Sequence, residues 1–197
     1  HTDEGWLKTL RTALAFEPTH LSCYELTFEE TTALGKMKIA GQIASLTEEE
    51  GRGLFLLTSR FLQEHGFIHY EISNFARGDE YCSRHNRKYW RHAPYLGLGP
   101  AAHSFQHGVR WWNYRSIEQY CKAAKRGLKP VEGSETLSPG QLRLERLFLG
   151  LRTRDGVTMD DAFGESPSEM LLSQIRASGL ATIRRNRIIP TVKGFLV

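Results

Sequence analysis

Residues 84 to 92 read Arg-His-Asn-Arg-Lys-Tyr-Trp-Arg-His, the densest grouping of metal-capable, cationic and flat aromatic side chains in the chain. If this segment is helical, residues four apart share a face, so His85 lies beside Tyr89. By the same spacing, Asn86 lies beside Trp90. These side chains together suit a porphyrin with its propionates. An imidazole can ligate the iron, an aromatic ring can stack on the porphyrin, and a guanidinium group such as that of Arg84 can bind a propionate. A surface helix that Trp90 anchors is the structural alternative.

A glycine-rich segment, Gly-Leu-Gly-Pro-Ala-Ala-His-Ser at residues 97 to 104, follows. Gly97 and Gly99 allow the backbone to turn and to approach a ligand, and Pro100 stiffens the path. No Gly-Lys-Ser/Thr follows, so the segment is not a nucleotide-binding P-loop. Together with the preceding segment it would frame one cavity from two sides, which makes His103 a second candidate iron ligand. A histidine with a purely structural role is the alternative.

The elements that must position these residues begin with a helix and a strand. Apolar residues at helical spacing predict a helix over residues 6 to 16, which Pro18 ends. Residues 20 to 28 then predict a strand. Residues 31 to 45 are mixed and contain glycine, so a lid-like insertion or a short helix is expected there.

A second helix and strand repeat this rhythm. Thr47 and the three glutamates after it are a helix start, and the helix is expected to end at Gly66. Residues 67 to 73 predict the next strand. Alternating helices and strands indicate parallel β/α units, in which the strand ends carry the site. Three polar residues lie at these strand ends: Glu25, Glu71 and Asn74. Each either contacts a cofactor or forms hydrogen bonds with loop backbone.

The last third of the chain predicts a small separate domain. A helix is expected near residues 116 to 126, followed by a linker at 127 to 135. Three helices and a β-hairpin follow, which together describe a winged-helix unit. Such units often bind DNA, but the third helix offers only Gln174 and Arg176 as readers of bases, so we rank nucleic-acid binding last. The signals for these elements are Ser138-Pro139, residues 159 to 163, Ser166-Pro167, and strands at 181 to 184 and 187 to 190.

Composition narrows the class of protein. The chain has 197 residues, of which 40% are hydrophobic and 24% charged, enough for a real core. No apolar run of about 18 residues predicts a membrane span, and no signal-peptide pattern opens the chain. Three scattered cysteines do not suggest a disulfide framework and favour a reducing, cytoplasmic location. The net charge of +4 favours anionic partners, among them porphyrins, nucleic acids and acidic proteins.

The letters HNRKYW resemble the H-N-x-x-Y-W pattern of the HemW heme chaperones, relatives of the oxygen-independent coproporphyrinogen oxidases, which are radical S-adenosylmethionine (SAM) enzymes. The resemblance spans nearly the whole chain. Glu30-Thr31 replaces a common Pro-Gly, and Ala101 stands where the family usually has a second glycine. The other segments that agree in order are HLSCYELTFE at 20 to 29, GFIHYEISNFAR at 66 to 77, YLGLGPAAHSF at 95 to 105, and the region after Gly140.

The resemblance implies the C-terminal part of a radical SAM partial (β/α) barrel over residues 1 to 127 and a winged-helix-like domain over 138 to 197. It implies heme as the ligand, with His85 as iron ligand, and in the full-length protein a [4Fe-4S] cluster and SAM. It also implies that the YEISNF segment, residues 70 to 75, faces the active cavity. The family's cluster loop, C-x-x-x-C-x-x-C, is absent here, and Cys23, Cys82 and Cys121 are too far apart to form one. We therefore expect this chain to be the C-terminal half of a longer protein.

Three functions stay open on the sequence. The first is a heme chaperone that delivers heme to respiratory acceptor proteins. The second is a radical SAM oxidase that decarboxylates two propionates of coproporphyrinogen III, and HNRKYW favours the first. The third is nucleic-acid or protein binding through the winged helix. A half-barrel would also leave a strand edge and apolar helix faces uncovered, so pairing with another chain, including a homodimer, or aggregation is expected.

Overall fold

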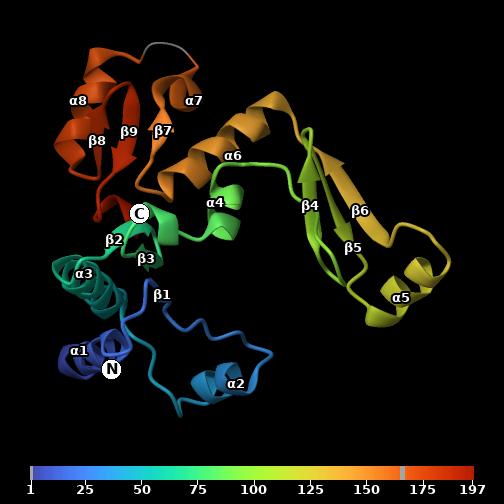
Figure 1. Cartoon of the computed structure of the whole chain (residues 1–197), viewed down its shortest axis with the longest axis horizontal. Coiled ribbons are helices and arrows are strands. Elements are labelled where there is room, and N and C mark those ends of the chain that lie inside the picture. The colour runs from blue at the N-terminus through green and yellow to red at the C-terminus, as the bar shows by residue number, and fades with distance from the viewer. Residues whose placement is uncertain (1, 165–166) are drawn as a thin grey trace. The chain divides into compact units, whose positions relative to one another are not determined.

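A computed structural model describes residues 2–164 and 167–197 (Figure 1). The chain forms two compact units, which are described separately. The first contains the residues up to Cys82 together with Ser178–Ala181 and Pro190–Val197. The second contains Ser83–Ala177 and Thr182–Ile189. Within the described residues, none of the helices combines the length and the apolar character that crossing a bilayer requires.

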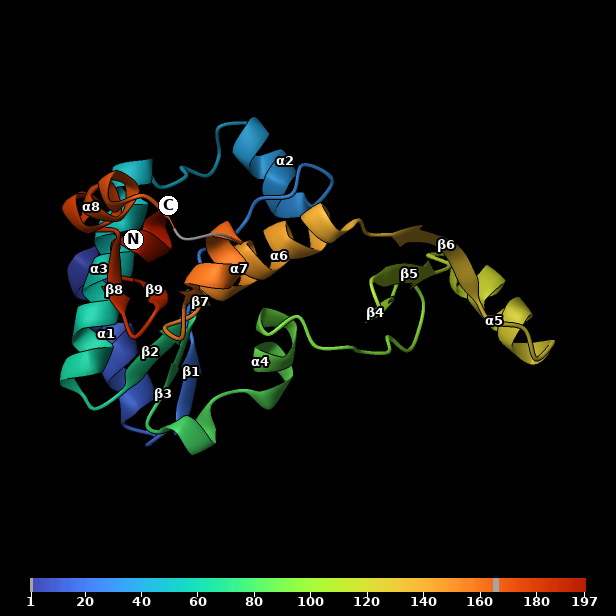
Figure 2. The same ribbon diagram turned by 90° about the horizontal axis from the view of Figure 1, so that it is seen from above.

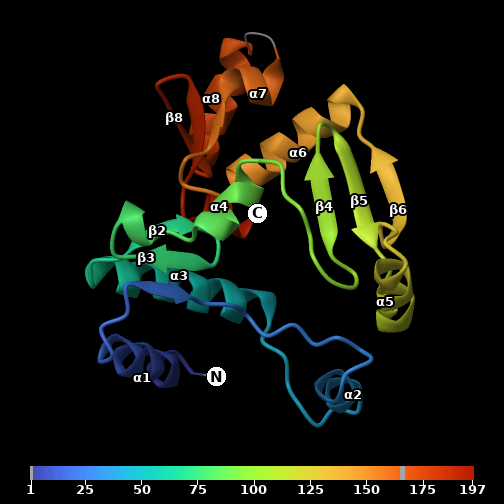
Figure 3. The ribbon, with the colours of Figure 1, turned by 45° about the vertical axis from the view of Figure 1, so that its right-hand side comes forward.

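The first unit is built on a three-stranded sheet with helices packed beside it (Figure 3). Its strand order is β1-β3-β2, and β3 pairs antiparallel with both neighbours. The outer strands β1 and β2 therefore run in the same direction, as the helix and strand rhythm predicts. The chain turns back after β2 and inserts β3 between them, so the two parallel strands are not hydrogen-bonded to each other. The bounds are α1 Asp3–Leu14, β1 His20–Ser22, α2 Ala33–Ile39, α3 Glu48–Glu64, β2 Ile68–Glu71, β3 Asn74–Ala76 and η1 Asp79–Tyr81.

Strand β1 is much shorter than the predicted strand at 20 to 28. Its partner β3 has only three residues, and a last bond from the Cys23 amide to the Ser73 carbonyl ends the pairing. With no further partner, the backbone beyond Cys23 leaves the sheet. Within residues 31 to 45, Ala33–Ile39 form the predicted short helix, α2.

Helix α3 begins and ends where the sequence predicts. Thr47 and Glu50 form a capping box, in which each side chain accepts a hydrogen bond from the other residue's backbone amide. At the other end Gly66 adopts a φ of +82° that suits glycine. The face of α3 that carries Phe61 and Leu62 packs with α1 and β3. This core consists of Leu10, Phe61, Leu62, Phe67 and Phe75.

The second unit contains α4, a three-stranded antiparallel sheet of order β4-β5-β6 and the long helix α6 (Figure 2). The predicted helices at 116 to 126 and after Ser138 are confirmed, and both have serine N-caps. The predicted linker at 127 to 135 is wrong in part, because β6 begins at Val131 and pairs with β5 from Val109 to Asn113. The bounds are α4 Arg84–Trp90, β4 His103–Gln106, β5 Val109–Asn113, α5 Ile117–Lys125, β6 Val131–Thr136 and α6 Pro139–Leu151.

The remaining elements follow the winged-helix prediction closely. Strands β8 and β9 form the predicted hairpin, and Arg185 and Asn186 at its turn both have positive φ. The predicted helix start at Ser166-Pro167 includes Ser166, which lies outside the described residues. The Leu171 amide instead donates to the Ser168 hydroxyl, 3.3 Å away. The bounds are β7 Val157–Thr158, α7 Met159–Phe163, α8 Glu169–Ser178, β8 Ala181–Arg184, β9 Arg187–Pro190 and η2 Gly194–Leu196.

Candidate functional site

Helix α4 carries the histidine and tyrosine that the sequence pairs. Ser83 caps the helix by accepting from the Asn86 amide at 3.2 Å. The Tyr89 hydroxyl lies 3.3 Å from Nε2 of His85, and the two rings meet edge to face at 4.9 Å. His85 is exposed and Tyr89 half-buried. If His85 ligates iron, its exposed ring is accessible from solvent, and either Nε2 gives up its contact with the Tyr89 hydroxyl or Nδ1 coordinates instead.

Trp90 lies against a residue that the sequence did not connect with it. The Arg152 guanidinium carbon is 4.7 Å from the centre of the Trp90 ring, so this cation occupies one face of the indole. The Trp90 indole nitrogen and Nε of Arg152 are both buried and have no hydrogen-bond partner among the described residues. Two adjacent donors without an acceptor suit a carboxylate or a water molecule. The face that Arg152 covers is not available for stacking on a porphyrin.

The basic side chains of α4 fall into two groups. Arg87 and Arg91 both approach Oδ2 of Asp155, at 3.7 Å and 3.6 Å. Arg84 and Lys88 are exposed, and in the ranges that the structure describes no carboxylate lies within 4.0 Å of them. Lys88 lies three residues after His85 and four after Arg84, so the two cations share the side of α4 next to His85 and are the best placed for an anionic ligand there.

The glycine segment folds onto its own neighbours. A Cβ on Gly97 would lie 2.1 Å from the His103 carbonyl oxygen, so the backbone approach that demands glycine here is to β4. The Gly97 amide donates to Ser104 at 3.0 Å, and the Asn113 amide group donates to the Gly99 carbonyl at 2.9 Å. His103 is exposed on β4, and its ring contact is with Trp112, at 5.9 Å.

The predicted cofactor residues lie in the other unit, where two of the three come together. Glu71 and Asn74 are each 1% exposed, and the Asn74 side-chain amide donates to Oε1 of Glu71. The Ser22 hydroxyl donates to Oδ1 of Asn74 at 2.5 Å. The network therefore closes the β2–β3 turn and ties it to β1. Glu25 is separate and exposed, with its carboxylate beside Gly51 in α3.

The cysteines do not fit an iron–sulfur cluster. Cys82 is buried, Cys121 is exposed, and burial raises the pKa of the Cys23 thiol to about 11, which disfavours the thiolate that ligates iron. Across residues 2–164 and 167–197, no three His, Cys, Asp or Glu side chains converge as a metal site.

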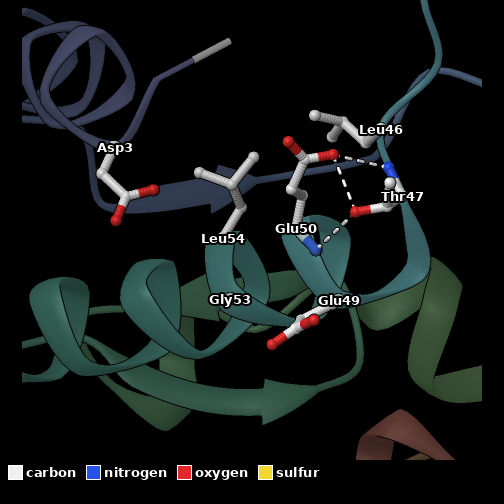
Figure 4. Close-up of a pocket in the computed structure, with 7 residues that line it drawn as sticks. All are labelled: Asp3, Leu46, Thr47, Glu49, Glu50, Gly53 and Leu54. Atoms are coloured by element: carbon white, nitrogen blue, oxygen red, sulfur yellow. Dashed lines mark hydrogen bonds between the residues drawn. The ribbon is translucent and has the colours of Figure 1, made fainter.

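A cavity of about 450 Å³ lies at the start of α3, at a place that the sequence did not indicate (Figure 4). Its lining contains three carboxylates, of Asp3, Glu49 and Glu50. Their negative charge is unsuited to a ligand edged with propionates. The Glu50 carboxylate is engaged with Thr47, whose backbone amide holds the pKa of Glu50 below its usual value.

Several contacts around α4 join residues far apart in sequence. Arg152, Glu145 and Asp155 each contact α4 or one of the two residues after it, and each lies more than fifty positions downstream. No local spacing relates such residues to Arg84–Trp90. Glu145 lies on a predicted helix, whereas Arg152 and Asp155 follow it, and none of the three carries a signal that links it to α4.

Known proteins resemble this chain in sequence and in fold. No family model matches the sequence. The heme chaperone HemW of Synechocystis sp. is 39% identical over 160 residues, covering 80% of this chain and 38% of that protein. HemW of Bacillus subtilis is 32% identical over 152 residues, covering 76% and 39%. HemW of Mycobacterium tuberculosis is 29% identical over 196 residues, covering 100% and 50%.

A solved structure is also similar, the Escherichia coli coproporphyrinogen III oxidase HemN, described as a radical SAM enzyme. The TM-score is 0.71 at 18% identity, over 100% of this chain and 50% of that one. This likeness establishes the fold, that of part of a radical SAM protein, as the sequence predicts. The chain spans between 38 and 50% of the length of the HemW proteins cited above. By these similarities, the chain belongs to the HemW family and corresponds to a part of its members' length.

Proposed function

We propose that this chain is the heme-holding part of a heme chaperone, and that the complete protein transfers heme to acceptor proteins of the respiratory chain. The observation that carries the proposal is the pair of His85 and Tyr89 on one exposed face of α4, within a chain of the HemW family. An exposed imidazole with Arg84 and Lys88 on one side of it combines an iron ligand with cations for propionates. Asn86, Trp90 and His103 complete the proposed heme-binding set.

The remaining predictions belong to the complete protein. We place it in the cytoplasm, with a [4Fe-4S] cluster and SAM held outside this chain. Glu71, Asn74 and Glu25 are proposed cofactor contacts. Glu71 and Asn74 already bond to each other, so a cofactor would have to add to that network or displace part of it. The division into regions 1 to 127 and 138 to 197 also stays a proposal.

Two other functions have less support. Coproporphyrinogen oxidation rests on a likeness at 18% identity, which speaks for the fold alone. Nucleic-acid binding through the wing is weakened because Arg187 donates to the carbonyls of Asp155 and Gly156, each at 2.8 Å. Arg176 lies 3.9 Å from Glu169. A salt-dependent mobility shift with duplex DNA would revive the second alternative.

Titration with hemin tests the proposal. Wild-type chain is expected to shift the Soret band, and His85→Ala to lower the affinity at least about tenfold, because the iron loses its protein ligand. His107→Asn is the matched control, since His107 is exposed in the β4–β5 turn at a φ of +50°, which Asn tolerates. Unchanged binding by His85→Ala would refute the ligand assignment. Turnover of coproporphyrinogen III by the reconstituted full-length protein would favour the oxidase.

A further inference from the structure

A group of charged side chains joins the end of α4 to the rest of the second unit. Nε2 of His92, two residues after α4, donates to Oε2 of Glu145 on α6 at 3.0 Å. Nη2 of Arg110 on β5 donates to both Glu145 oxygens, each at 2.8 Å. The His92 side chain is only 10% exposed. Short, partly buried, charge-assisted bonds of this kind hold their elements in one arrangement.

His92 also fixes the point at which α4 ends. Its backbone has a φ of +52°, a conformation that a histidine holds only when its surroundings enforce it. Its amide donates to the Tyr89 carbonyl at 2.9 Å, and its ring stacks on the buried Phe105 at 4.3 Å. Stacking on Phe105 and the hydrogen bond to Glu145 together fix the orientation of the His92 ring.

A second contact carries this arrangement to the candidate heme face. Tyr95 forms backbone hydrogen bonds with Phe105 in both directions, and its ring meets Tyr89 edge to face at 4.6 Å. Tyr89 in turn contacts His85. Burial raises the pKa of the Tyr95 hydroxyl above its usual value, so this ring stays neutral at physiological pH. Rings and charges thus form a continuous series of contacts from Arg110 to His85.

We propose that His92, Glu145 and Arg110 are positioning residues that hold α4 so that the His85–Tyr89 face is presented in one orientation to its ligand. The claim that this orientation serves the ligand rests on the proposed heme function, whereas the claim that these residues hold α4 in place does not. The bond from Glu145 raises the pKa of Arg110 above its usual value, so the Arg110 guanidinium stays protonated at neutral and alkaline pH. The Asp155 contacts with Arg87 and Arg91 are longer and more exposed, and hold α4 more weakly.

Two carboxylates on the same arginine supply a matched pair of variants. Glu135 on β6 accepts from Nη1 of Arg110 at 3.0 Å, as Glu145 accepts from Nη2, but only Glu145 contacts His92. Glu145→Gln and Glu135→Gln therefore remove the same charge from the same partner. Only the first loosens the end of α4. His92→Asn is a third variant that keeps the Arg110–Glu145 pair and tolerates the positive φ, in case Glu145→Gln fails to fold.

The first measurement is hydrogen exchange of the amides at the end of α4 in the 197-residue chain without heme. We expect Glu145→Gln and His92→Asn to accelerate exchange of the Arg91 to Ala93 amides at least about tenfold, and Glu135→Gln to leave it near wild type. Equal exchange in Glu145→Gln and Glu135→Gln would overturn the positioning role of the group.

The second measurement repeats the hemin titration with the same variants. Weaker binding by about tenfold and a changed Soret position in Glu145→Gln, with Glu135→Gln unchanged, support the role in ligand presentation. Loosened α4 amides together with wild-type hemin affinity and spectrum would overturn that role. If the wild-type chain binds no hemin while the α4 amides still respond, the proposed heme function fails and the positioning of α4 stands.

Discussion

At the scale of single residues, strain marks a place where this chain departs from its family. Ala101, which stands where the family usually has glycine, has a φ of +59°. That left-handed conformation costs an alanine about 1 kcal/mol more than a glycine. The Ala101 amide nevertheless donates to the Tyr114 carbonyl at 3.0 Å, so the turn is held from outside.

Replacing Ala101 by glycine should therefore relieve this strain. We expect Ala101→Gly to raise the free energy of unfolding by about 1 kcal/mol, measured from urea denaturation curves. Ala93→Gly, at a residue without positive φ, is a suitable control and should gain nothing. A loss of stability in Ala101→Gly would show that the conformation carries no cost.

At the scale of elements, a buried histidine joins α3 to the sheet of the first unit. Nε2 of His69 on β2 donates to the Ile72 carbonyl at 3.0 Å, so Nδ1 accepts from the Ser59 hydroxyl at 2.9 Å. The ring stacks on Phe75 at 4.1 Å. Both ring nitrogens are therefore hydrogen-bonded while the ring is neutral. Burial lowers the pKa of His69 below its ordinary value.

This lowered pKa predicts a loss of stability in acid. Above about pH 6.5 the ring is neutral in both folded and unfolded chains and contributes no pH dependence. Below that pH the unfolded chain takes up a proton that the folded chain refuses. The free energy of unfolding then falls by at most about 1.4 kcal/mol for each pH unit, until the folded ring protonates too.

Urea midpoints between pH 5 and 8 test this expectation. His69→Gln, which keeps polar groups at the site but cannot titrate, should flatten the curve. Part of the slope should remain, because burial also lowers the pKa of His20. Identical slopes in wild type and His69→Gln would show that His69 titrates normally in the folded protein.

At the scale of the whole molecule, apolar side chains remain exposed in both units. On α6, Leu144 and Phe148 lie four residues apart and are 50% and 62% exposed. Strands β1 and β2 are the outer strands of the first unit's sheet. Exposed apolar stripes and unpaired strand edges favour association with another chain.

We therefore expect this chain to self-associate at micromolar concentration. Light scattering coupled to size-exclusion chromatography should report species larger than a monomer. The double variant Leu144→Lys and Phe148→Lys should shift the distribution toward monomer, whereas Arg143→Lys, on the same helix, should not. A single monodisperse monomer of the wild-type chain would contradict the expectation.

What the sequence determined by itself is local. Capping at Thr47 and Ser138, the glycine that ends α3 and the pairing of His85 with Tyr89 depend on residues within one or two turns of helix, where spacing dictates contact. The family and its fold followed from short motifs in their order along the chain.

The tertiary structure decided the long-range pairings. Nothing near β2 in sequence shows that the chain turns back to place β3 beside β1, or that residues 131 to 136 form a strand with β5 instead of a linker. Nor does spacing relate Trp90 to Arg152, or His92 to Glu145. Such contacts arise where backbone groups and charges find partners only after the elements have packed, so only the tertiary structure decides the surroundings of α4.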